Sequence, residues 1–254
     1  KPVADQEIVL SRLLDVVSKT SLRRSGFGAS AVWEKGWTQV LERVQKQGFS
    51  FDTLAPQYFQ GQFTFRVDRE FYYSDIPNSA YFLDLIVRDQ FLRSCLSNHG
   101  RIVELGAGTG LNLLLLEQIW PGREILLTDW VKPSIDLAIL ARQVVDLEVS
   151  ATQFNITTLD GWERLEVGPG DTILTTQSLE QVGPFHKPLI NRLIQAKPSK
   201  CVHMEPIKEV YDPTQPVDAT AIAYHEKRGY LDGFASYIRN LRDRGLVSEF
   251  NVTR

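Results

Sequence analysis

Two carboxylates and three closely spaced glycines have the clearest chemical potential in this sequence. Glu104 lies in the apolar run 102–105, and Asp129 directly follows the run 124–128. Between the two runs the glycines occupy alternate positions: Gly106, Gly108 and Gly110. A glycine turn after a strand exposes backbone N–H groups to a ligand. The pattern therefore predicts a site where a nucleotide-like molecule meets backbone amides at the end of a sheet.

The elements around these residues form a strand–turn–helix–strand unit. Residues 102–105 and 124–128 have the length and apolarity of buried strands, and residues 111–120 have helical length. Pro121 and Gly122 end that helix. A dinucleotide fingerprint would place a third glycine at the sixth position, where this chain has Leu111. The glycine spacing therefore disfavours an NAD-dependent dehydrogenase.

The stretch VELGAGTG, residues 103–110, resembles motif I of class I S-adenosylmethionine (AdoMet)-dependent methyltransferases. The resemblance implies an α/β fold, a Rossmann-like sandwich with a mainly parallel sheet. It also implies AdoMet as the cofactor and S-adenosylhomocysteine as its product. Asp129 would accept hydrogen bonds from both ribose hydroxyls. Asn155 would hold the adenine amino group, although an aspartate is commoner there. The complete set of implied cofactor contacts is Glu104, Gly106, Ala107, Gly108, Gly110, Asp129, Trp130, Phe154, Asn155 and Thr176.

Length and charge limit the remaining function classes. A chain of 254 residues buries a large core without disulfides, and we expect its two cysteines to be reduced thiols. A net charge of −3 argues against a nucleic-acid groove. The sequence has no apolar run of membrane-spanning length and no signal peptide. We expect a soluble cytoplasmic protein with a small-molecule partner and no nucleic-acid or membrane partner; a homodimer is compatible with the sequence.

Residues 1–98 precede the glycine motif and are expected to form a mostly helical, aromatic-rich cap. Apolar spacing predicts helices over 8–17, 29–47 and 81–96, and residues 63–67 alternate like a strand or hairpin arm. The many aromatic residues between positions 49 and 73 fit either a small helical core or a lid that excludes water from the reacting groups. The resemblance favours the lid.

Residues 99–254 are expected to form the AdoMet-binding domain. Further strands are predicted over 146–153, 171–176, 200–204 and 247–252, and the family's last, antiparallel strand would then be missing. Either the chain is truncated or the sheet edge is completed otherwise. The segment TQSLEQ, residues 176–181, lies at a strand end where ligands bind, and its Glu180 and Gln181 could instead cap the following helix. A loop with Pro213, Pro216 and Asp218 and one long helical region to Leu241 should follow.

Methyl transfer from a sulfonium to a hydroxyl gains mainly from alignment and from a base near the operating pH. The candidates for catalysis are His225, Glu205 and His186. His225 lies off the predicted packing face of its helix and so does not read as an ordinary core histidine. The end of the chain, with EPI and YHEKRGYL, looks like the tails of small-molecule and sugar O-methyltransferases. We therefore expect a methyltransferase acting on a small molecule of natural-product or sugar type, at a hydroxyl oxygen.

Two further alternatives remain open at this point. A divalent metal could be held by a scattered set of ligands, although no compact motif supports it: His203, Glu205, Asp218 and His225. The chain could also be a binding module that retains the fold without turnover. A methyl-transfer assay separates that module from an enzyme.

Overall fold

The computed structural model describes residues 2–3, 5–19, 22–61 and 63–254. Its centre is a five-stranded parallel sheet in the order β5-β4-β3-β6-β7. This arrangement confirms the predicted α/β fold with a parallel sheet. The strands are β3 (Ile102–Leu105), β4 (Glu124–Asp129), β5 (Glu148–Gln153), β6 (Thr172–Thr176) and β7 (Lys200–Met204).

The sheet is buried on both faces, as expected for a parallel sheet. Successive side chains of a strand point to opposite faces, so Ile125 and Leu127 of β4 enter one apolar cluster and Leu126 enters another. Ile102 and Val103 of β3 divide in the same way. Glu104 is therefore exceptional, because it is a carboxylate in the middle of a fully buried strand.

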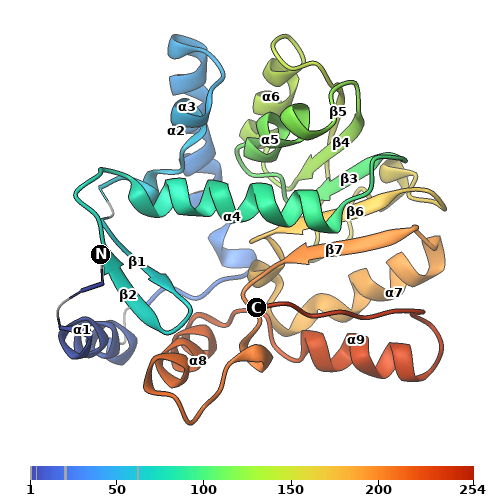
Figure 1. The fold of residues 1–254 in the computed structure, drawn as a ribbon. Coiled ribbons are helices and arrows are strands. Elements are labelled where there is room, and N and C mark those ends of the chain that lie inside the picture. The colour runs from blue at the N-terminus through green and yellow to red at the C-terminus, as the bar shows by residue number, and fades with distance from the viewer. Residues whose placement is uncertain (1, 4, 20–21, 62) are drawn as a thin grey trace.

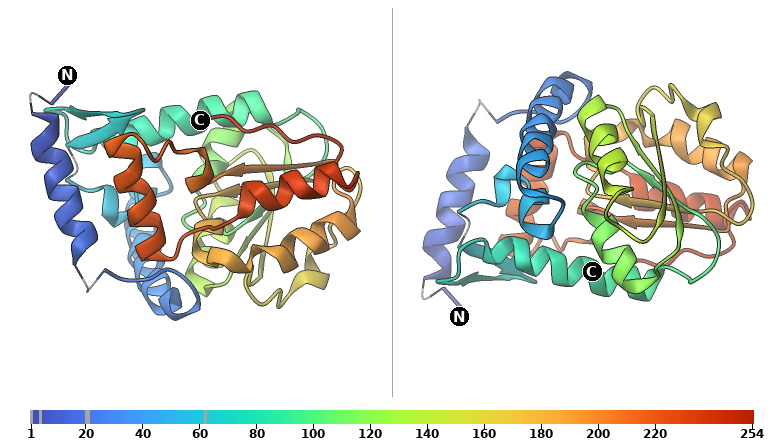
Figure 2. Two further views of the ribbon diagram at one scale, coloured as in Figure 1. Left: turned by 90° about the horizontal axis from the view of Figure 1, so that it is seen from below. Right: turned by 90° about the horizontal axis from the view of Figure 1, so that it is seen from above.

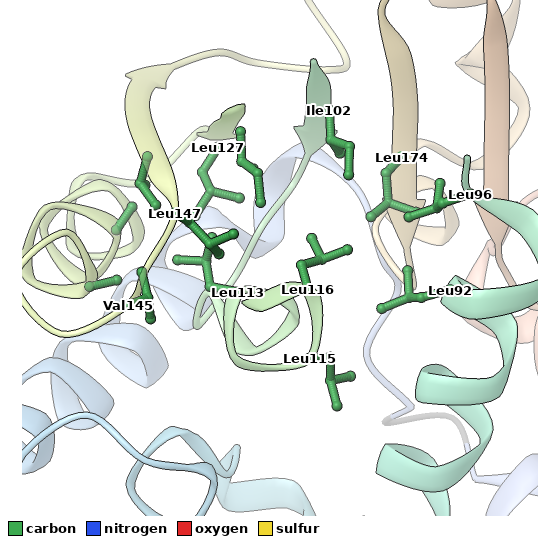
Figure 3. Close-up of a cluster of buried hydrophobic side chains, with 14 of the residues drawn as sticks. Leu92, Leu96, Ile102, Leu113, Leu115, Leu116, Leu127, Val145, Leu147 and Leu174 are labelled. Carbon is green, nitrogen blue, oxygen red and sulfur yellow. The ribbon is translucent and has the colours of Figure 1, made fainter. Parts of the chain in front are cut away.

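Helices cover the two faces of the sheet. The first apolar cluster joins strands to α4, α5 and α6, and Figure 3 shows Leu92 of α4 and Leu96, just after that helix, beside Ile102 and Leu174, with Leu116 of α5 below. The second cluster joins the opposite face to α7 and α9, which lie together on the other side of the sheet in Figure 1. These helices are α4 (Ser79–Cys95), α5 (Leu111–Ile119), α6 (Lys132–Ala141), α7 (Lys187–Ala196) and α9 (Phe234–Asp243).

The amino-terminal segments lie beyond the carboxyl ends of the strands, away from α7 and α9 (Figure 2). Residues 63–73 contain the hairpin arm that the alternation predicted. The elements are α1 (Gln6–Ser18), α2 (Ser30–Gln47), α3 (Phe51–Leu54), β1 (Thr64–Val67) and β2 (Glu70–Tyr73), with short 3₁₀ turns η1 (Phe27–Ala29) and η2 (Gln57–Phe59). The α2 helix packs on α6 of the sheet layer through Trp37, Val40 and Leu137.

A carboxy-terminal helix, α8 (Pro216–Arg228), packs with this amino-terminal layer against α1. The Ser25 hydroxyl donates to the backbone oxygens of Arg228 and Gly229 at 3.0 and 2.9 Å. The fully buried Asp218 accepts from Arg254 at 2.6 Å and from Arg69 of the hairpin turn at 3.3 Å. The layer over the strand ends is therefore built from both ends of the chain. The division at residue 98 stays a prediction.

Three sequence expectations for the last fifty residues are wrong. Residues 247–252 form no strand, and largely exposed polar residues interrupt their apolar positions. Pro216 begins α8 instead of lying in a loop, because proline fits the first helical turn, and Asp218 lies inside that helix. The expected long helix is two helices, since Gly229 and Gly233 both adopt φ +68° and end or precede a helix.

The other elements match the prediction to within a few residues. The segment after β6 starts with a 3₁₀ stretch, η4 (Leu179–His186), before α7, and two more turns are η3 (Trp162–Leu165) and η5 (Lys208–Val210). Within the described part of the chain, we find no helix with both the length and the apolarity needed to span a bilayer.

Candidate cofactor-binding site

The glycine turn after β3 is held against β4 by its own backbone. The N–H groups of Gly106 and Ala107 both donate to the carbonyl of Thr128, at 2.9 and 2.8 Å. Gly106 has φ +77°, and a Cβ there would lie 2.5 Å from Cβ of Ser178. Glycine is required at this position both by the backbone angle and by the close approach of the β6 loop.

Asp129 lies at the end of β4 and faces the glycine turn. Its Oδ2 accepts from the N–H of Gly108 at 2.9 Å, and its Oδ1 accepts from the N–H of Val131 at 3.1 Å. Only 4% of the residue is exposed, and burial raises the pKa of its carboxyl to about 6. Each carboxylate oxygen has two lone pairs, so both oxygens retain capacity for a ligand hydroxyl.

A pocket opens above the turn at the carboxyl edge of the sheet. It contains about 510 Å³ of empty space, part of which is open to solvent. Its lining residues are Trp33, Trp37, Gly106, Gly108, Asp129, Trp130, Phe154, Ile156, Thr157, Gln177, Ser178, Gln181 and Val182.

The lining has two chemically different ends. Trp130 and Phe154 follow β4 and β5 and are apolar groups on the Asp129 side of the lining, whereas Ile156 lies close to Gly106. Gln177, Ser178 and Gln181 follow β6 and supply polar groups on the other side, next to the apolar Val182. The indoles of Trp33 and Trp37, from α2, complete the lining, with ring centroids 5.4 Å apart. An elongated ligand with an aromatic base at one end and a polar group at the other fits this division.

Half of the predicted cofactor contacts reach this pocket: Gly106, Gly108, Asp129, Trp130 and Phe154. The other half do not line it: Glu104, Ala107, Gly110, Asn155 and Thr176. The Asn155 side chain accepts from the N–H groups of Thr157 and Thr158 at 2.9 and 3.3 Å, which makes it a turn-forming residue. Its contact with adenine stays a prediction.

Glu104 belongs to a buried polar network below the pocket. Its Oε1 accepts from Asn112 Nδ2 at 2.6 Å and from Thr176 Oγ1 at 3.3 Å. Arg88 of α4 donates to Asn112 at 3.2 Å and pairs with Asp84, which also accepts from the Gln177 amide at 3.1 Å. The network links α4 to the pocket wall, and it leaves the buried Glu104 Oε2 without a hydrogen-bond partner.

We expect the stability of the protein to fall as the pH rises from about 4.5 to about 7. Burial raises the pKa of Glu104 from 4.5 to about 7. The folded state then binds the Glu104 proton more tightly than the unfolded chain does. The stabilisation from this proton is complete below the pKa of the unfolded chain, and it is lost as the pH rises through the pKa of the folded state. Urea unfolding across this range measures the slope.

Glu104→Gln should flatten that slope and raise stability above pH 7 by on the order of 3 kcal/mol. The exposed Glu163, whose side chain is 85% exposed, gives the matched control variant Glu163→Gln. Equal pH slopes for Glu104→Gln and the parent protein would contradict the assignment of the effect to Glu104.

The three catalytic candidates lie in different surroundings, and none lines the pocket. Glu205 is the nearest, because its carboxylate accepts from the backbone N–H groups of Ser178 and Glu180 at 3.1 and 3.2 Å. It therefore holds the β6 loop in place. Burial raises its pKa to about 7.

His186 and His225 are both buried. His186 is 1% exposed and packs edge-on against Phe234 and Tyr237 on the α9 side. His225 is 7% exposed and packs among Tyr211, Tyr224 and Tyr230, so the expectation that it is not a core histidine is wrong. The packing face around His225 was predicted for one continuous helix, whereas α8 and α9 are separate helices. The prediction for His225 was wrong for this reason. Burial lowers the pKa of His225 to about 4, which favours a neutral ring.

The scattered metal-ligand set is not brought together. Across the described ranges, no group of three or more His, Cys, Asp or Glu residues could hold a metal ion. Asp218 is instead paired with Arg254, and His203 Nδ1 lies 2.9 Å from the Thr175 hydroxyl.

No family model and no curated protein matches the sequence. Among solved structures, the chain is similar to a coclaurine N-methyltransferase bound to N-methylheliamine and S-adenosylhomocysteine (14% identity, TM-score 0.41). That match covers 74% of this chain and 52% of the other, so the chain spans about half the length of that enzyme. An O-methyltransferase family 2 protein from Planctomyces limnophilus, in complex with apigenin, is also similar (12% identity, TM-score 0.36, 89% and 93% covered).

Both of these structures are of methyltransferases. The similarity is low in each case, and the function is therefore inferred below from the site itself.

Several pocket residues were missed by reasoning from the sequence. Trp33 and Trp37 were expected only as part of the predicted helix 29–47, and neither was given a role in the site. Their spacing of four places both on one helix face. That spacing is a signal for a shared role, but only the packing of α2 over the glycine turn reveals the ligand side. Gln177 lies in the segment 176–181 that was predicted at the ligand-binding edge, but it was not singled out; its φ of +56° marks a constrained loop.

Proposed function

We propose that this protein is an AdoMet-dependent methyltransferase that methylates a small molecule at a hydroxyl oxygen. One observation carries the proposal: the glycine turn and the buried carboxylate of Asp129 meet in a single pocket at the carboxyl edge of a parallel sheet. That is the place and the chemistry that a nucleoside cofactor requires. The resemblance of the motif selects AdoMet among the nucleosides.

The residues present fit this cofactor. Gly106 and Gly108 leave room where a Cβ would contact Ser178 and Trp37. Asp129 would accept hydrogen bonds from the ribose hydroxyls, and Trp130 and Phe154 would contact the adenine. When bound, AdoMet supplies an electrophilic methyl group on a positively charged sulfur. The chain's own task is to align an acceptor with that group and to exclude water.

The α2 helix supports a covering role for the amino-terminal segment. Trp33 and Trp37 are aromatic groups that limit access of water and tolerate a neighbouring cation through their ring faces. An acceptor must enter beside them, which favours a small molecule, here proposed to be of natural-product or sugar type. Residence in the cytoplasm and a homodimeric state are further proposals from the sequence.

Titration calorimetry with AdoMet, S-adenosylhomocysteine and NAD tests the proposal. We expect both AdoMet and S-adenosylhomocysteine to bind and NAD to show no binding. Tight binding of NAD alone would instead favour a dehydrogenase. A second assay measures S-adenosylhomocysteine formation over a panel of phenols, catechols, sugars and amines; binding without turnover on any of them would favour the non-catalytic module.

A further inference from the structure

A carboxylate that no sequence motif assigned to the reaction lies one hydrogen bond behind the polar side of the pocket lining. Glu180 belongs to the loop after β6, and its Oε1 accepts from Nε2 of Gln181 at 2.9 Å. Gln181 lines the pocket, and its Oε1 in turn accepts from the indole N–H of Trp33 at 3.3 Å. Glu180 is therefore joined to the pocket wall and to the helix that covers it.

The direction of the bound cofactor follows from the two ends of the pocket and rests on the proposed function. With the ribose on Asp129 and the adenine beside Trp130 and Phe154, the sulfur end must extend past Gly106 toward the β6 loop. That loop is where Gln177, Ser178 and Gln181 line the pocket. A sulfonium at this end would lie close to the Glu180 carboxyl and would favour its ionised form.

Groups from three other elements surround this carboxylate. Burial, and then Glu205 after β7, raise the pKa of Glu180 to about 8. The Gln181 amide, Arg228 and the hydroxyl of Tyr230 oppose the rise. Tyr58 from η2 also lies within electrostatic range of Glu180. The two glutamates differ in role, because Glu205 is occupied by backbone N–H groups at both oxygens, whereas Glu180 is bonded to side chains that could rearrange around an acceptor.

We propose that Glu180 is a catalytic residue that lies beside the sulfonium and takes the proton of the acceptor hydroxyl. In this step the acceptor oxygen forms a bond to the methyl carbon, and the carbon–sulfur bond breaks. Its electron pair stays on sulfur, giving S-adenosylhomocysteine, and the hydroxyl proton passes to the Glu180 carboxylate. A base with a pKa near the operating pH is suited to this transfer.

Proton-linked calorimetry tests the position of Glu180 without an identified acceptor. AdoMet and S-adenosylhomocysteine differ by the methyl group and its positive charge. A nearby cation lowers a carboxyl pKa by about 1 to 3. Titrations near pH 7, in two buffers of different ionisation enthalpy, should therefore show AdoMet releasing about half a proton more than S-adenosylhomocysteine. Glu180→Gln should abolish this difference and change both affinities less than threefold, whereas Glu163→Gln should preserve it.

The outcomes separate this inference from the proposed function. If the folded parent protein binds neither compound, the proposed function fails and this inference with it. If AdoMet binds with no additional proton, or if Glu180→Gln keeps the additional proton, the inference alone is overturned. Should Glu180→Gln fail to fold, the parent's additional release must still decline above about pH 8, where the carboxyl is already ionised. A release that does not decline there overturns the inference.

Turnover gives the second readout. With the best acceptor of the panel, Glu180→Gln should lower kcat by about 100-fold or more, the usual contribution of a general base. The variant should also lose the rise of kcat with pH that the parent shows. Unchanged kcat in a variant that binds AdoMet normally would overturn the proton-accepting role.

Discussion

Asp129→Ala is expected to weaken AdoMet binding by about 100-fold or more while the protein remains folded. A carboxylate that accepts from two ribose hydroxyls contributes about 3 kcal/mol or more, since each hydrogen bond to a charged group is worth about 1.5 to 3 kcal/mol. The substitution also leaves the N–H groups of Gly108 and Val131 without their present acceptor. We therefore expect lower stability as well, and circular dichroism must accompany the calorimetric measurement.

Two variants make this experiment specific. Asp136→Ala removes a partly exposed carboxylate of α6 that pairs with the exposed Lys132, so it should leave AdoMet affinity unchanged. Asp129→Asn keeps one acceptor oxygen for the turn and should give an intermediate affinity. If folded Asp129→Ala bound AdoMet as tightly as the parent protein, neither the ribose contact nor the proposed cofactor site would survive.

Arg88→Met is expected to lower the free energy of unfolding by about 3 to 5 kcal/mol, the usual cost of removing one partner from a buried ion pair. Arg88 and Asp84 have side chains only 8% and 10% exposed. The substitution leaves the Asp84 carboxylate without its cation, and it removes the positive charge that lowers the pKa of Glu104. Urea unfolding near pH 7 measures the effect.

A surface pair on the same helix provides the matched control. Arg93 and Asp89 have the same spacing of four residues as Arg88 and Asp84, but the Arg93 side chain is 47% exposed. Arg93→Met should cost only about 0.5 kcal/mol. The double variant Asp84→Asn/Arg88→Met should recover part of the loss, since the uncompensated charge of Asp84 is removed. Equal effects for Arg88→Met and Arg93→Met would show that the buried network does not stabilise the protein.

The elements that depend on local patterns could be predicted from the order of residues alone. Apolar runs of strand length, the alternate glycines and Asp129 predicted β3, the turn, α5 and β4 in the correct order, because a parallel strand buried on both faces must be nearly all apolar. Gly106, Gly108 and Asp129 were identified because each directly follows, or lies close after, one of these predicted strands. Their backbone angles and their place at a strand end are dictated within about thirty residues of chain.

The distant residues that join the glycine turn could be identified only from the folded chain. Trp33 of the amino-terminal layer and Gln181 after β6 are 148 positions apart and meet through one hydrogen bond. His225 and His186 lie outside the pocket because they pack among aromatic rings, a feature that residue type alone does not predict. Glu180 stands out from other surface-type glutamates only when the folded chain surrounds it. Local sequence carries the backbone geometry of the cofactor turn, whereas long-range packing decides which side chains face the ligand.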